Sequence, residues 1–444
     1  MGSGIDPRVA FIAAATWHGP LEPAQAILAD HPEIAGSDIH TAAILGDDAG
    51  VRRFLAFDAG NVTAKSPPYG GDALNYLCLS KYLRLDPSRS DGFLRAATAL
   101  LEAGADPNTG FWTTGEHPEF ETALYGAAGV AHHAALTRLL LERGADPNDE
   151  EAVYHSPETR DTDAMKALVE TGRLTDESLS LMLIRKHDWH DYEGAQFLLE
   201  HGADPNRKRR RGFSALHHAL ARDNALEMFA LLLDHGADPT RTVAGRSVVA
   251  MAAREGRSDV LDLFEQRGVP VALQGVDRLI AACARDDTTL VRTIAEREPR
   301  LVHDVLALGG ELLAKFAGTG NTAGVRQLLD LGVAAAARFV EGDGYFAIPK
   351  NSLAIHVAAW RAQPGIVRLL IARGSPVDEP DANGLTPLAL AVRACVDSYW
   401  TEMRSPESVD ALLRAGASVR GVGYPCGYAD VDELLRSHGA RAEP

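Results

Sequence analysis

The chain has 444 residues, 46% of them hydrophobic and 24% charged, which is the composition of a folded protein rather than a disordered one. Its 61 acidic and 44 basic residues give a net charge of -17, which argues against nucleic-acid and anionic-membrane binding because both need a positive surface. The four cysteines are widely spaced, the N-terminal stretch lacks a basic leading region, and no apolar run approaches the roughly 18 residues of a membrane span. We therefore expect a soluble, cytoplasmic protein.

A nine-residue pattern recurs along the chain. LLEAGADPN ends at residue 108, LLERGADPN at 148, LLEHGADPN at 206 and LLDHGADPT at 240, with weaker copies further on. Each copy begins as an apolar helix end, the glycine stops that helix, and Asp-Pro opens a turn. A shorter alanine-rich segment precedes each copy, as in TALYGAA at 122–128. A helix, a turn, a second helix and a glycine stop, recurring roughly every 30 to 40 residues, predict a stacked solenoid.

Counting back from each stop places the first helix of each unit. These helices are expected near 10–19, 37–46, 72–81, 122–131, 151–160, 180–189, 214–223, 247–256, 277–286, 311–320, 353–362 and 386–395. A short unit at about 429–440 is expected to cap the stack. The prediction is an all-α fold in which about twelve units form one elongated domain over residues 1–444, with long loops between repeats.

These segments resemble the ankyrin repeat. TPLALA from Thr386 and SALHHA from Ser214 match the start of its first helix, and the Gly-Ala-Asp-Pro-Asn stops match its end. The resemblance implies that small alanines pack between first helices. It implies that His217 and His356 hydrogen-bond neighbouring backbone, and that the residues after each alanine pair line a concave groove.

This register selects the side chains expected to bind a ligand in the groove. They are Trp17, His18, Tyr76, His155, Glu158, His187, Asp188, His218, Arg222, Arg254, Glu255, Trp360 and Arg361. Neighbouring units stack about 10 Å apart, so the histidines and carboxylates between 155 and 218, together with Arg222, are expected to converge on one ligand. A histidine beside a carboxylate suits acid–base chemistry. The alternative is that any solenoid groove is polar.

The stretch IRKHDWHDYEG, at 184–194, is divided by the same register. His187 and Asp188 are expected to face the groove. His190 and Asp191 are expected in the turn between helices, where an acidic residue caps the second helix. A metal ion shared by His187 and His190 is not favoured, because the two residues lack helical i, i+4 spacing.

Three loops, 63–72, 109–121 and 339–351, are longer than repeat turns require. They carry the aromatic residues Tyr69, Phe111, Trp112, Tyr345 and Phe346. Such loops could cover a binding site, or each could fold back over its own solenoid. The basic segment RKRRR at 207–211 could bind an anion or form a solvated turn.

Two functions are therefore open. The first is a module that binds a protein or peptide on its concave groove, with no nucleic-acid or membrane partner. The second is a small-molecule-binding protein or a cofactor-independent enzyme, with His155, Glu158, His187 and Asp188 as catalytic groups. In this second case Tyr69 and Trp112 would roof the pocket. We find no established catalytic signature and expect neither a cofactor nor a metal.

Overall fold

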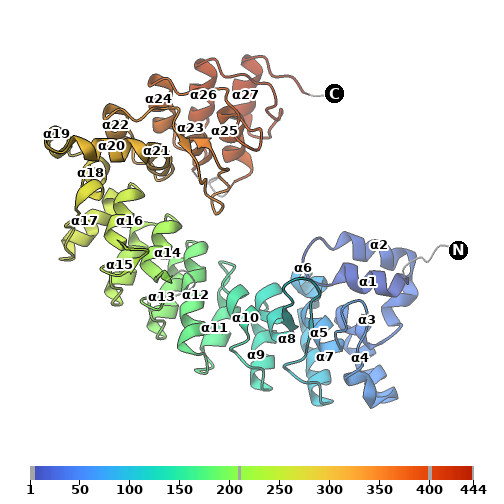
Figure 1. Cartoon of the computed structure of the whole chain (residues 1–444). Coiled ribbons are helices and arrows are strands. Elements are labelled where there is room, and N and C mark those ends of the chain that lie inside the picture. Colours follow the sequence, from blue (N-terminus) through green and yellow to red (C-terminus); the bar gives the residue numbers. More distant parts are fainter. Residues whose placement is uncertain (1–5, 209–211, 399–402, 443–444) are drawn as a thin grey trace. The chain divides into compact units, whose positions relative to one another are not determined.

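The chain forms two units of short helix pairs. The computed structural model describes residues 6–208, 212–398 and 403–442. Its backbone contacts divide the chain into unit 1, Met1–Ala219 with Leu231–Ala237, and unit 2, Leu220–Ala230 with Asp238–Pro444. In each unit, helices follow one another in pairs joined by tight turns (Figure 1).

Unit 1 begins with the N-terminal helices and ends near the middle of the chain. Its elements are α1 (Pro7–Ala15), α2 (Glu22–Asp30), η1 (Pro32–Gly36), α3 (Ile39–Ile44), α4 (Asp48–Phe57), η2 (Ala59–Val62), α5 (Ala73–Cys78), α6 (Lys81–Leu85), η3 (Pro87–Arg89), α7 (Ser90–Glu102), β1 (Gly110–Trp112), β2 (Phe120–Thr122), α8 (Ala123–Tyr125), η4 (Gly126–Val130), α9 (Ala134–Glu142), α10 (Glu150–His155), α11 (Asp163–Val169), α12 (Asp176–Asp188) and α13 (Tyr192–Glu200). The first helices α3, α5, α8, α10 and α12 pack in that order, and the second helices α4, α7, α9 and α11 pack beside them.

Unit 2 continues the pattern. Helices α14 (Ala215–Ala221) and α15 (Leu226–Asp234) contribute residues to both units. The other elements are β3 (Thr242–Val243), β4 (Arg246–Ser247), α16 (Val248–Arg254), α17 (Ser258–Gln266), α18 (Gly275–Ala284), α19 (Thr288–Arg297), α20 (Pro299–Ala307), α21 (Gly309–Gly318), α22 (Thr322–Asp330), β5 (Arg338–Phe339), β6 (Ser352–Leu353), α23 (Ala354–Trp360), α24 (Pro364–Ala372), α25 (Pro387–Val396), α26 (Glu407–Arg414) and α27 (Ala429–Ser437). No helix in the described ranges is both long and apolar enough to cross a membrane.

Local sequence explains where the helices begin and end. Thr175 accepts a hydrogen bond from the Ser178 backbone at the start of α12, and Asp191 accepts one from Gly194 at the start of α13. A side-chain oxygen at this position satisfies an amide that has no partner within the helix. Gly202, at φ 95°, follows α13 in the left-handed conformation that glycine adopts without strain. The same cap and stop recur from pair to pair.

The predicted helical solenoid is confirmed, and each expected first helix is present within a few residues of its predicted position. Helix α12 begins four residues earlier than expected, because Thr175 caps it. Helix α27 occupies the predicted cap. The prediction missed α6 and α20. In α20, Pro299 begins a helix that has Leu301, Val302 and Val305 on one face. One continuous domain across both units stays a prediction.

The long loops fold back on the unit that carries them. The 109–121 loop is a hairpin in which Phe111 pairs with Glu121, and Phe111 is buried. In the 339–351 loop, the carbonyl oxygen of Phe346 accepts a hydrogen bond from Trp360 Nε1 at 2.7 Å. This is the second of the two alternatives left open by the sequence. Trp112 is the exception, with 64% of its surface exposed.

Unit 2 is internally tied by contacts between distant repeats. The Lys315 ammonium lies 2.6 Å from a Glu255 carboxylate oxygen, and Asn321 donates to the Gly256 carbonyl at 2.6 Å. Arg361 pairs with Asp223, 138 positions earlier in the chain, at 2.6 Å. The insertion of α20 accompanies this packing, since α18 contacts both α20 and α22.

Gly256 and Gly268 lie on either side of α17. Substitutions at these two glycines test how closely α21 packs on the turn before α17. Both have positive φ, 75° and 74°, but a Cβ at Gly256 would lie 2.6 Å from the buried Phe316 ring, whereas nothing lies within 4 Å of one at Gly268. We expect Gly268→Ala to cost about 1 kcal/mol of unfolding free energy from backbone strain. Gly256→Ala should cost about 1–3 kcal/mol more from overpacking. Urea unfolding followed by circular dichroism measures both, and equal losses would contradict the packing described here.

Candidate functional site

Six polar side chains of unit 1 form a connected series, here called the ladder, on α10, α12 and α14 and in the turn after α10. Its members are Glu151, His155, Glu158, Arg185, Asp188 and His218. His155 Nε2 lies 3.3 Å from Glu151 and its Nδ1 lies 2.8 Å from Glu158. Arg185 then pairs with both Glu158 and Asp188. Asp188 Oδ1 lies 2.8 Å from His218 Nε2, which completes the series. Four predicted site residues are thus brought together.

The geometry of α12 explains why His187 does not belong to the ladder. Successive helix residues are rotated by about 100°, so Arg185 and Asp188, three positions apart, share a face that His187 does not. The His187 side chain is fully buried, and burial together with the charge of His218 lowers its pKa to about 3. The expectation that His187 faces a groove beside Asp188 is therefore corrected, because none of the His187 surface is exposed.

Charge pairing fixes the protonation of the ladder. Burial alone would lower the pKa of His155, but its hydrogen bonds with Glu151 and Glu158 outweigh this and raise the pKa to about 9. Burial would likewise raise the pKa of Glu158, but the hydrogen bond and charge of His155, followed by the charge of Arg185, lower it. At neutral pH His155 is a cation, and both of its nitrogens face carboxylates. It is therefore not available as a general base.

An aromatic cluster lies in the N-terminal part of unit 1. The Trp17 ring meets Tyr69 edge-on at 5.4 Å and Phe111 edge-on at 5.5 Å, and Tyr69 stacks on Phe111 at 5.3 Å. Trp17 and Tyr69 are partly exposed, whereas Tyr76 is fully buried beneath Tyr69 at 6.4 Å. The predicted residues of the first and third repeats and of two loops are therefore close together.

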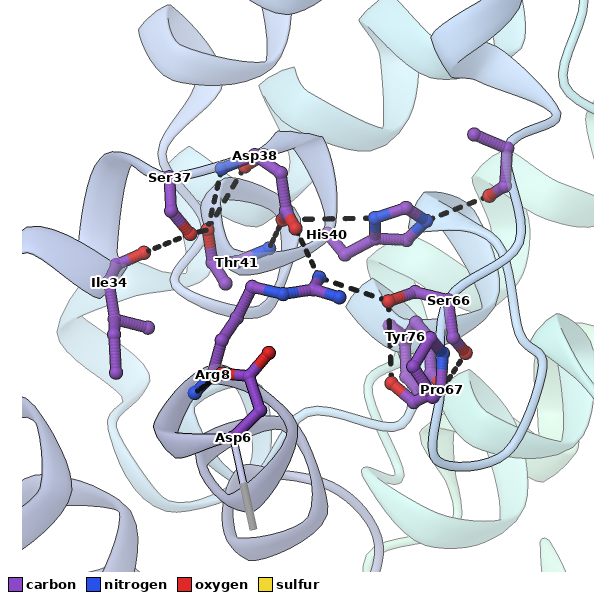
Figure 2. A network of polar contacts seen from close by, with 11 residues as sticks. Asp6, Arg8, Ile34, Ser37, Asp38, His40, Thr41, Ser66, Pro67 and Tyr76 are labelled. Carbon is purple, nitrogen blue, oxygen red and sulfur yellow. Dashed lines mark hydrogen bonds and ion pairs between the residues drawn. The ribbon is translucent and has the colours of Figure 1, made fainter. Parts of the chain in front are cut away.

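The 63–72 loop is held against α1 and α3 by the polar network in Figure 2. Arg8 pairs with Asp38, and its Nη1 donates to Ser66 Oγ at 3.1 Å. His40 Nε2 lies 2.8 Å from a loop carbonyl oxygen. Burial alone would raise the pKa of Asp38, but its hydrogen bond with His40 outweighs this, and the pKa falls to about 2. The carboxylate that anchors the network is therefore charged at neutral pH.

Tyr76 and Tyr69 extend this anchoring to the aromatic cluster. The Tyr76 hydroxyl donates to the Ser66 carbonyl at 2.7 Å and accepts from the Tyr69 backbone amide at 3.2 Å (Figure 2 shows the Tyr76 contact with Ser66). The Tyr69 ring is thus held in place by a network that begins at α1. Tyr76 supports the cluster from inside rather than facing a groove.

Glu121 is a candidate that the sequence did not reveal. The residue is 3% exposed, and its Oε2 has no hydrogen-bond partner among the described residues. Burial raises its pKa to about 7, and the negative charge of Glu151 adds to the rise. The backbone carbonyl of Glu121, in contrast, accepts from Asn75 Nδ2 at 3.0 Å. Alternation in the 109–121 hairpin would have placed this residue, but only with the register already known.

Two other positions connect the cluster to the ladder. Tyr125, on α8, has its pKa raised by burial and then by the nearby carboxylates, with a hydrogen bond to Trp17 opposing the rise. His18 is exposed in the turn after α1. Partial desolvation lowers its pKa, and the positive charges of Arg84 and then His155 add to this. The charges of the ladder therefore act on residues that lie beside the aromatic cluster.

The remaining candidates lie in unit 2 and are mostly used internally. Arg254 is 9% exposed and pairs with Asp277 at 2.6 Å. Arg361 is 6% exposed and lies over the Phe346 ring at 4.0 Å, besides its pairing with Asp223. Trp360 is buried, and Arg222 lies over the Tyr345 ring at 4.1 Å. The contacts of Arg222 and Arg361 explain how the 339–351 loop is held. Arg254, Trp360 and Arg361 are buried, which disagrees with the expectation that they face a ligand.

Several structural roles predicted from the sequence are confirmed. Asp191 caps α13, and His190 takes a positive φ of 51° in the preceding turn. His356 Nε2 lies 2.7 Å from the Glu379 carbonyl, as the resemblance implied for its position. Cys78 and Cys283 are buried, and burial raises the pKa of the Cys283 thiol to about 12. Most of the basic segment at 207–211 lies outside the described residues.

The ladder makes a specific pH-dependent prediction. We expect the His155 imidazole to titrate near pH 9 in nuclear magnetic resonance spectra of isotope-labelled histidine, with His155→Gln assigning the signal. Because the pKa is raised above its unfolded value near 6.5, the stabilisation should be complete below pH 6.5 and lost as pH rises through 9. Glu158→Gln should move the midpoint down by at least one unit. A wild-type midpoint near 6.5 would contradict the ladder.

Comparison with known proteins agrees with this helix-pair repeat. Residues 181–273 match the family model for ankyrin repeats, in three copies. Protein glp-1 of Caenorhabditis elegans is 26% identical over 254 residues, which cover 51% of this chain and 17% of that protein. The chain thus spans about a sixth of that relative's length. The human ASB11 ankyrin repeat domain has 16% identity and a TM-score of 0.26 over 59% of this chain and 99% of its own. That TM-score supports no conclusion here. Residues 181–273 therefore match ankyrin repeats, and the same helix pair with its caps recurs through both units.

Proposed function

We propose that this chain is a protein-binding module that recognises a segment of its partner on a groove in unit 1, formed by the ladder and the aromatic cluster. Ankyrin repeats generally mediate protein–protein interaction. The observation that carries the proposal is the ladder itself. It crosses three successive first helices with every charge paired, so its side chains are ordered before a partner arrives.

Ordering in advance favours recognition, because less side-chain entropy is lost on binding. Arg185 is held by Glu158 and Asp188, and its guanidinium also lies over the Tyr154 ring at 4.1 Å. Tyr154 is 40% exposed, and the His155 side chain is 27% exposed. Tyrosine, tryptophan and arginine are the residues most enriched where interfaces gain their affinity. These side chains combine an accessible ring with a fixed polar edge.

The catalytic alternative has less support. An acid–base residue works best with a pKa near the operating pH, whereas the pKa of His155 is about 9 and that of His187 about 3. The net charge of -17 favours a protein partner over nucleic acid or an anionic membrane. Four free thiols, three of them buried, agree with a cytoplasmic location.

Site-directed photocrosslinking tests the proposal. A benzophenone amino acid replaces Tyr154, beside the ladder, or Tyr192, at the start of α13. These two tyrosines are matched in exposure, at 40% and 41%. We expect position 154 to crosslink to a defined partner and position 192 not to, with the adduct identified by mass spectrometry.

The identified partner then allows an affinity measurement. Arg185→Met should weaken its binding at least tenfold, because two carboxylates lose their shared cation. Crosslinking at Tyr192 alone, or equal crosslinking at both positions, would contradict this location of the binding surface.

A further inference from the structure

We infer that the aromatic cluster and Glu121 form a subsite for a basic side chain, an arginine or lysine presented by the partner. This deepens the proposed function and rests on it, since it names the chemical group that unit 1 recognises. Glu121 is 3% exposed, and its Oε2 has no hydrogen-bond partner in the described part of the chain.

Such a group is unusual. Buried polar atoms in folded proteins nearly always have a partner, and a buried carboxylate is costly unless a cation or several donors face it. Within the described residues, no lysine or arginine forms an ion pair with Glu121. Arg8 and Lys65, elsewhere in unit 1, are both paired with aspartates. A cation brought by the partner would satisfy this carboxyl group and hold it in its charged form.

The charges around Glu121 favour the same occupant. Glu151, Glu119 and Asp149 act on it with negative charge, and His155 is the opposing cation. His155 is itself held between Glu151 and Glu158, so its charge is already shared by two carboxylates. A further positive charge would relieve the excess of negative charge.

The aromatic rings supply a second, independent reason. Phe111 pairs directly with Glu121 across the hairpin, so their side chains lie on the same face of the ribbon, with Cβ atoms about 4.5–5.5 Å apart. Phe111 in turn contacts Trp17 and Tyr69, which are both partly exposed. Faces of tryptophan and tyrosine attract ammonium and guanidinium groups. The carboxyl group suits the charged end of a basic side chain, and the rings suit its aliphatic stem.

Small probes test the subsite without knowledge of the partner. The full chain, with its five tryptophans labelled as 5-fluorotryptophan, is titrated with N-acetyl-arginine methylamide and N-acetyl-lysine methylamide. N-acetyl-citrulline methylamide serves as the neutral control. Trp17→Phe assigns the Trp17 resonance. We expect a saturable shift of that fluorine resonance with the two cations and none with citrulline. A shift of equal size with citrulline, or no shift with either cation, would overturn the inference.

Matched variants locate the interaction. Glu121→Gln should weaken cation binding at least tenfold, whereas Glu116→Gln, which removes an exposed carboxylate from the same hairpin, should leave it unchanged. Unaltered binding in Glu121→Gln would overturn the inference. If Glu121→Gln lowers the unfolding temperature, Tyr69→Leu decides instead. A fivefold loss of cation affinity supports the subsite, and full retention overturns it.

The outcome separates this inference from the proposed function. If the full chain shows no preference for the two cations over citrulline but position 154 still crosslinks to a partner, the subsite alone is overturned. Loss of that crosslink overturns the binding surface in unit 1.

Discussion

The contact of the Arg185 guanidinium with two carboxylates is the interaction on which the unit 1 surface depends. Glu158 follows α10 and Asp188 ends α12, so one cation joins two successive repeats. Without it the two carboxylates would face each other partly desolvated, which is unfavourable for both. Its position also decides the state of its neighbours, because Glu158 can then hold His155 as a cation and Asp188 can bind His218.

Much of the fold could be predicted because the repeat is encoded locally. Glycine stops, side-chain caps and apolar helix faces each act within a few residues, so they can be recognised without knowledge of tertiary contacts. The missed α20 carried the same signals, with Pro299 at its start, but no glycine stop of the repeated type drew attention to it. The ion pair between Asp223 and Arg361 in unit 2 could not be predicted, because the two residues lie 138 positions apart in the sequence.

The candidate site could be predicted in part, and its errors have a geometric cause. His155, Glu158, Asp188 and His218 were found because they follow the alanine pairs of their repeats, and the structure joins them. His187 was included because the repeat register placed it with Asp188 in the pair expected to line the groove, although neighbouring helix residues point about 100° apart. The i, i+3 spacing of Arg185 and Asp188 would have identified the guanidinium that matters. Glu121 required the hairpin register, which its loop does not specify.

Two units of the same repeat thus use their polar residues differently. In unit 2, Arg254 and Arg361 are buried in ion pairs that hold its own repeats together, whereas the ladder of unit 1 leaves Tyr154 and His155 accessible. Hydrogen exchange of the chain with its crosslinked partner bound tests this distinction most directly. We predict slower exchange in residues 109–121, 150–158 and 176–188, with no change in the second helices α9, α11 and α13. Protection confined to those second helices, or to unit 2, would contradict the account.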